Sequence, residues 1–233
     1  MSRARLAVAL DIPLPDGERL YGQVAPYAGV AKVGLSLFVE HGPRAVEVFK
    51  RLGADVFLDL KLHDIPNTVE LAAARAAALG VKYLTIHAGG GRKMIEAAVR
   101  GAAKGGVGTT VLAVTVLTSM DSDELRGIGV QDSPGAQVER LARLAQDGGA
   151  GGLVCSVQEV EALRRVVGPK MVLCTPGIRP AGAAKGDQAR VDTPAAAIAK
   201  GADLLVVGRP IYEAKDASAA AKAILDEVAS ASP

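Results

Sequence analysis

The sequence predicts an α/β protein: a closed (β/α)8 TIM barrel in which residues 1–233 form a single domain. Short apolar runs of strand length alternate with amphipathic segments of helix length along the whole chain. A repeated strand–helix pattern requires a parallel sheet. The pattern repeats eight times, in a chain slightly shorter than is typical for such barrels, and this favours closure over an open, doubly wound sheet. No change of composition marks a second domain.

The predicted strands are apolar runs that end next to a polar residue or a glycine. The run at 110–116, for example, is rich in Val and Thr, which favour strands. In chain order the predicted strands span residues 6–10, 29–33, 56–60, 83–86, 110–116, 152–155, 171–174 and 204–207.

The segments between these runs have helical length and periodicity. Pro66 suits the first turn of a helix, where a missing N–H costs little. The longest irregular segment, residues 175–190, is rich in Gly, Pro and Ala and predicts a lid beside a ligand site. The predicted helices span residues 16–25, 37–52, 66–79, 89–103, 134–146, 157–167, 193–200 and 214–229.

Composition argues against several classes of protein. The residues are 49% hydrophobic and 22% charged, as in ordinary soluble domains, and the net charge is +2. Without a block of Lys or Arg, and with 3% aromatics, the chain is not expected to bind nucleic acid. No stretch is long enough for a membrane span, and the first apolar run is too short for a signal peptide. Cys155 and Cys174 are expected to be buried small hydrophobes, which fits a reducing cytoplasm.

The segment 59–68 is the strongest candidate for chemistry. Asp59 and Lys61 are two residues apart, so both can point to the same side of a strand, and Asp64 follows on the turn. An Asp-x-Lys pair is often a surface ion pair of little consequence. Here, however, the charges follow an apolar strand, and the carboxyl ends of strands are where barrels of this class carry their chemistry.

Polar residues also follow other predicted strands. If the barrel closes, these strand ends face one mouth, so residues scattered in sequence would converge, although any one of them could be a solvated rim residue. The residues are Asp11, Lys32, Asp59, Lys61, His87, Thr118, Arg179 and Arg209.

The last two strands are followed by candidate phosphate ligands. Gly208 and Arg209 come after the eighth strand and Arg179 after the seventh, where barrels of this class frequently bind phosphate. Glycine allows close approach of the backbone, and Arg can grip an anion bidentately. Gln188 could add an amide donor. The alternative is a tight turn with a solvated Arg. No motif for ATP or a nicotinamide cofactor is present.

At this point the sequence resembles a known family. The segment Asp59-x-Lys61-x-x-Asp64-Ile65-Pro66-Asn67-Thr68 is similar to the signature of orotidine 5′-phosphate decarboxylases, and the resemblance spans nearly the full chain. The other matching segments are residues 9–11, Lys32, 114–119, 175–180, 187–191 and 206–211.

The resemblance implies a homodimeric barrel that converts orotidine 5′-monophosphate to uridine 5′-monophosphate and carbon dioxide without metal or organic cofactor. Lys61 would donate the proton, with Asp59 beside it. Asp64, Ile65 and Thr68 would reach the partner's site. The remaining substrate-binding residues would be Asp11 and Lys32 at the ribose, Thr118 at the base, Gln188, Gly208 and Arg209 at the phosphate, and Arg179 at the lid. The start and end of the chain suggest that it stands alone, without a fused enzyme.

Two other functions fit part of the pattern. A related barrel, a magnesium-dependent sugar-phosphate decarboxylase or aldolase, would use the same acids around a metal ion. The continuation Pro66-Asn67-Thr68 and the turn 117–119 favour the orotidine enzyme. A non-catalytic phosphate-binding barrel would keep Gly208 and Arg209 but would not need Lys61.

Overall fold

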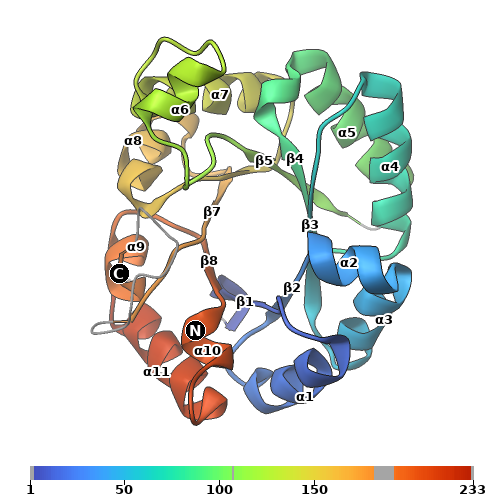
Figure 1. Cartoon of the computed structure of the whole chain (residues 1–233), viewed down its shortest axis with the longest axis vertical. Coiled ribbons are helices and arrows are strands. Elements are labelled where there is room, and N and C mark those ends of the chain that lie inside the picture. Colours follow the sequence, from blue (N-terminus) through green and yellow to red (C-terminus); the bar gives the residue numbers. More distant parts are fainter. Residues whose placement is uncertain (1–2, 107, 181–191, 232–233) are drawn as a thin grey trace.

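The computed structural model describes residues 3–106, 108–180 and 192–231, and its eight strands close into one parallel barrel (Figure 1). Each strand pairs with the next along the chain, and β1 also pairs with β8, so the predicted fold is confirmed. The strands are β1 (Leu6–Ala9), β2 (Val30–Gly34), β3 (Asp55–Leu62), β4 (Tyr83–His87), β5 (Thr110–Val114), β6 (Gly152–Val154), β7 (Val172–Thr175) and β8 (Leu204–Val207).

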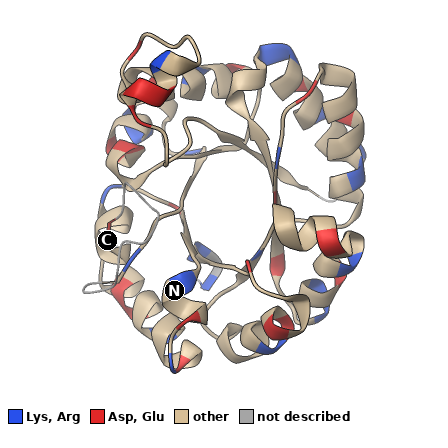
Figure 2. Ribbon diagram, in the orientation of Figure 1, with Lys and Arg blue, Asp and Glu red and all other residues tan. Residues whose placement is uncertain are grey.

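Helices surround the barrel as an outer ring (Figure 1). Positive and negative residues are interspersed along these helices (Figure 2). No helix in the described part of the chain is long and apolar enough to cross a membrane. The helices are α1 (Leu14–Val24), α2 (Leu35–His41), α3 (Pro43–Arg51), α4 (Pro66–Ala78), α5 (Arg92–Lys104), α6 (Ser122–Gly127), α7 (Pro134–Asp147), α8 (Val157–Val167), α9 (Pro194–Ala199), α10 (Arg209–Tyr212) and α11 (Ala217–Ser230), with 3-10 turns η1 (Arg3–Arg5) and η2 (Ala88–Gly90).

Several elements differ from the sequence-based prediction. The predicted helix 37–52 is divided into α2 and α3 because Gly42 adopts φ of 55° and Pro43 starts a new helix. The short helices α6 and α10 were not predicted. The signal for α6 is a capping box in which the Asp121 side chain accepts backbone N–H bonds and Glu124 bonds back. The last predicted helix, 214–229, begins three residues later, at Ala217.

Two apolar layers fix where a pocket can form. One lies between the sheet and the helices and includes Leu58 of β3. The other fills the barrel interior, where Phe57 and Tyr83 meet edge to face with ring centroids 5.9 Å apart. Inward-facing residues alternate with outward-facing ones along each strand. The interior is therefore packed, and an open cavity is left at the carboxyl ends of the strands.

Candidate active site

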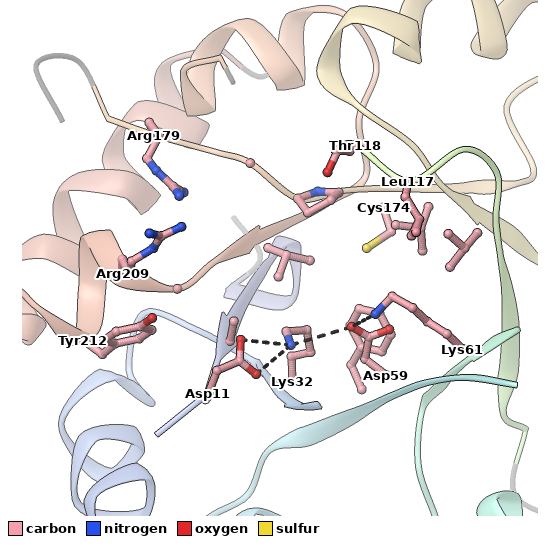
Figure 3. Close-up of a pocket in the computed structure, with 18 of the residues that line it drawn as sticks. Asp11, Lys32, Asp59, Lys61, Leu117, Thr118, Cys174, Arg179, Arg209 and Tyr212 are labelled. Atoms are coloured by element: carbon pink, nitrogen blue, oxygen red, sulfur yellow. Dashed lines mark hydrogen bonds and ion pairs between the residues drawn. The ribbon is translucent and has the colours of Figure 1, made fainter. Parts of the chain in front are cut away.

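A pocket of about 500 Å³ opens at the carboxyl ends of the strands. Its volume suits a small-molecule ligand. Polar side chains lie along its floor and at one end, as Figure 3 shows. The charged and hydroxyl-bearing residues that line it are Asp11, Lys32, Asp59, Lys61, Thr118, Arg179, Arg209 and Tyr212.

The floor of the pocket carries a row of alternating charges. Lys32 Nζ lies 3.2 Å from Asp11 Oδ1 and 3.7 Å from Asp59 Oδ2. The Lys61 Nζ lies 2.7 Å from the same Asp59 Oδ2. The four residues of this row, Asp11, Lys32, Asp59 and Lys61, lie on or just after β1, β2 and β3. They come together because these three strands are neighbours in the barrel.

Asp59 is held in its charged form. Burial opposes its ionisation, but the nearby Lys32 and Lys61 outweigh this effect and keep the pKa of Asp59 below its ordinary value. Its side chain is 13% exposed, whereas that of Lys61 is 30% exposed. The pair therefore forms a partly dehydrated site in which an ammonium group can reach a bound ligand.

The backbone at Lys61 is unusual. Its φ of 50° is positive, a conformation that non-glycine residues rarely adopt. The register between β3 and β4 shifts between Leu58 and Leu62, which marks a bulge. Such a local irregularity at a strand end turns a side chain away from regular alternation, and here it presents Lys61 to the pocket.

One end of the pocket is cationic. The guanidinium groups of Arg179 and Arg209 face each other across it, and Tyr212 lies beside them (Figure 3). Burial, followed by the charge of Arg209, lowers the pKa of Arg179. Gly177 and Gly208 also line this end. Two facing cations with adjacent glycine backbone make a setting that an anion would stabilise. Tyr212 was missed from sequence because a Tyr in a helix after the last strand carries no distinctive signal.

The rest of the wall is apolar, and none of its side chains was predicted from the sequence to bind the substrate. Burial raises the pKa of the Cys174 thiol well above its ordinary value, so this sulfur acts as an apolar surface. The lining residues that lie on strands face inward by alternation, which is the same pattern that fills any barrel core. The apolar lining residues are Ala9, Phe57, Val114, Val116, Leu117, Val154, Cys174, Pro176 and Val206.

Three of the predicted site residues lie outside this pocket. Asp64, Ile65 and Thr68 are exposed, and Asp64 Oδ1 accepts the backbone N–H of Ile65 at 2.7 Å. His87 also lies outside the pocket, with its ring centroid 5.6 Å from that of His63.

Gln188 lies outside the described residues, so its predicted contact with phosphate stays a prediction. Among the described residues, no group of three or more His, Cys, Asp and Glu side chains is placed to hold a metal ion.

Comparisons with known proteins agree on one family. The model of the Orotidine 5′-phosphate decarboxylase / HUMPS family matches residues 4–224. A curated relative from Anaeromyxobacter sp. (strain K), named orotidine 5′-phosphate decarboxylase, is 58% identical over 221 residues, covering 94% of this chain and 96% of the relative. One of the same name from Moorella thermoacetica is 47% identical over 234 residues, covering 97% and 93%. The crystal structure of orotidine 5′-phosphate decarboxylase from Lactobacillus acidophilus superposes with a TM-score of 0.86 at 38% identity, covering 96% of this chain and 98% of that one.

Proposed function

The chain belongs to the orotidine 5′-phosphate decarboxylase / HUMPS family, and we propose that it decarboxylates orotidine 5′-monophosphate with Lys61 as the proton donor. It is an enzyme of the decarboxylase type, as its curated relatives are, and the reaction belongs to pyrimidine biosynthesis. The products are uridine 5′-monophosphate and carbon dioxide. The observation that carries the proposal is the row of alternating charges ending at Lys61.

The chemical step places a negative charge on a ring carbon. When the bond to the carboxylate breaks, its electron pair stays on the pyrimidine carbon, and the carboxylate leaves as carbon dioxide. An ammonium group fixed beside that carbon stabilises the developing charge and then transfers a proton to it. Lys61 Nζ, 2.7 Å from Asp59 Oδ2, is an ammonium fixed in this way. The amine that remains regains a proton from solvent.

The Asp59 carboxylate forms ion pairs with two lysines. Its Oδ2 is shared between Lys61 Nζ at 2.7 Å and Lys32 Nζ at 3.7 Å. Because the pKa of Asp59 is lowered, its carboxylate presents a negative charge to the Nζ atoms of both lysines. We infer that Asp59 aims Lys61, while Asp11 and Lys32 bind the ribose hydroxyls at the other end of the row.

We infer that phosphate binds between Arg179 and Arg209, next to the backbone of Gly208. The facing guanidinium groups and the lowered pKa of Arg179 support this, since an anion between them would offset their repulsion. Thr118 lies across the pocket from the row of alternating charges and would border the base (Figure 3). Phosphate binding far from the reacting carbon can contribute energy to orientation of the base.

We also propose a homodimer in which Asp64, Ile65 and Thr68 complete the partner's site. These residues are exposed and lie outside their own pocket. Ile65 is 67% exposed, and large apolar side chains on α2 and α4 are also exposed, namely Leu35, Val39 and Leu71. Exposed apolar residues of this size are a common feature of interaction surfaces. Cys155 and Cys174 are both buried, which fits the cytoplasmic location that we expect.

The direct test follows the orotate absorbance of orotidine 5′-monophosphate mixed with the purified protein and EDTA. We expect rapid conversion to uridine 5′-monophosphate. Conversion that needs added magnesium, or turnover of a sugar phosphate in place of the nucleotide, would support the metal-dependent alternative.

A further inference from the structure

Thr85 connects the two side chains at the centre of the proposed reaction. It lies on β4, is fully buried and does not line the pocket. Its hydroxyl oxygen accepts the backbone N–H of Lys61 at 2.9 Å. The same hydroxyl donates to Asp59 Oδ1 at 2.8 Å. One oxygen atom therefore bonds to the backbone of one charged residue and the carboxylate of the other.

The bulge in β3 lies opposite this residue. Leu58 pairs with Leu84 and Leu62 pairs with Ile86, so three residues of β3 face Thr85 alone on β4. Regular pairing cannot satisfy the backbone of three residues with one partner. The Thr85 hydroxyl takes the Lys61 N–H that the bulge displaces, and this bond supports the positive φ of Lys61.

Because of the hydrogen bond from Thr85, the two oxygens of the Asp59 carboxylate have different partners. Thr85 occupies Oδ1, which leaves Oδ2 to face Lys61 and Lys32. A carboxylate without this anchor could rotate about its last torsion, which is broad for Asp. Fixing Oδ1 therefore fixes the position of Oδ2, and with it the position of the Lys61 ammonium group. Thr85 also favours the charged carboxylate, because a hydrogen bond to the ionised form stabilises it.

We propose that Thr85 is a positioning residue for proton transfer by Lys61, acting through the bulge and the Asp59 carboxylate. The proposal rests on the proposed function. Thr85 does not reach the pocket, so it acts on kcat and leaves binding of the nucleotide to other residues.

Two pairs of variants isolate the hydroxyl. Thr85→Val keeps the shape of threonine and removes the hydroxyl, whereas Thr85→Ser keeps the hydroxyl and removes a methyl group. Thr85→Ala then differs from Thr85→Ser by the hydroxyl alone. We expect kcat of Thr85→Val to fall about 10- to 100-fold, the usual effect of losing a bond to a charged group, with Thr85→Ser close to wild type. The Kd for uridine 5′-monophosphate should stay within about threefold.

A control and a second measurement keep the result interpretable. Thr109→Val removes a comparable hydroxyl bond, from Oγ1 to the Val81 carbonyl at 2.7 Å, before β5 and away from the pocket. Its kcat should not change. Amide hydrogen exchange at Lys61, measured without substrate, should be slow in wild type and Thr85→Ser and faster in Thr85→Val and Thr85→Ala.

The outcomes separate this proposal from the proposed function. Equal kcat in the two members of each pair, Thr with Val and Ser with Ala, would overturn the role of Thr85. If Thr85→Val does not fold, the comparison of Ser with Ala decides. If wild type fails to decarboxylate orotidine 5′-monophosphate, the proposed function is wrong, and hydrogen exchange at Lys61 still tells whether the hydroxyl holds the bulge.

Discussion

Lys61 and Asp59 form an ion pair of 2.7 Å although a backbone bulge separates their positions on β3. In a regular strand, residues two apart already point to the same side. At Lys61 the strand is not regular, because its φ is 50° and positive. The pair therefore coexists with a strained backbone conformation, and such strain clusters at functional sites.

Removing the ammonium group should stop the reaction. We expect Lys61→Ala to lower kcat by at least about 10⁴-fold, because both charge stabilisation and the proton donor are lost. Lys61→Arg keeps the charge but gives up a proton far less readily, so it should also be slow. Isothermal titration with uridine 5′-monophosphate should still show binding to both variants. Turnover near that of wild type in Lys61→Ala would show that another group delivers the proton.

A dimer with shared sites predicts recovery of activity from two inactive variants. In a heterodimer of Lys61→Ala and Asp64→Ala, one site carries both lesions and the other carries neither. Random exchange of subunits in an equal mixture should restore about one quarter of the wild-type sites. The measurement is kcat of the mixture before and after exchange, with mass spectrometry to show that heterodimers form. Heterodimers without activity would contradict the crossing of Asp64.

If Arg209 binds phosphate, its substitution should affect binding of a nucleotide but not of a nucleoside. Arg209→Ala should weaken binding of uridine 5′-monophosphate about 10- to 1000-fold and leave binding of uridine unchanged, because the nucleoside has no phosphate to lose. Arg92→Ala, which removes an exposed arginine paired with Glu96, serves as the matched control. The same loss for nucleotide and nucleoside would mean that Arg209 supports the fold of the pocket instead of binding phosphate.

Acid should weaken the fold partly through Asp59. Its pKa in the folded protein is lowered from the ordinary 3.8, so its contribution to stability is present above the unfolded pKa and is lost as pH falls through the folded value. Asp59→Asn removes this titration. The difference in free energy of unfolding between wild type and Asp59→Asn, measured with urea, should be constant from pH 7 to about 5 and change below about pH 4. A constant difference down to pH 3 would mean that Asp59 has the same pKa in both states.

The sequence was sufficient to predict the barrel and the charged residues at the strand ends. It was not sufficient to predict the hydrogen bonds that align these charged side chains. Apolar runs and their polar ends are local patterns, so Asp11, Lys32 and Lys61 could be placed at one mouth before the structure was known. The partner of a bulge depends on register between strands, which local patterns do not determine. Thr85 therefore looked like an ordinary strand residue. Asp64 was singled out by its place on the turn after Lys61, and its role in the partner's site by resemblance; one protomer does not bring it into the pocket.

Gly34 lies close to Asp11 and Lys32, a contact that the sequence alone could not reveal. It ends β2, and a Cβ there would lie 2.6 Å from Asp11 Oδ1 and 3.2 Å from Lys32 Nζ. The first distance is too short, so Asp11 must move, and its side chain is 47% exposed and free to do so. Gly34→Ala should therefore fold normally while it displaces the carboxylate that we assign to the ribose.

The expected result is a KM for orotidine 5′-monophosphate raised about tenfold, with the melting temperature within a few degrees of wild type. Gly22→Ala is the matched control, because a Cβ at Gly22 in α1 meets nothing within 4 Å. Double substitution with Asp11→Ala distinguishes the cause. If displacement of Asp11 is the whole effect, Gly34→Ala should add little to Asp11→Ala, since the two changes act on one contact. Full additivity of the two changes would mean that Gly34 acts by another route.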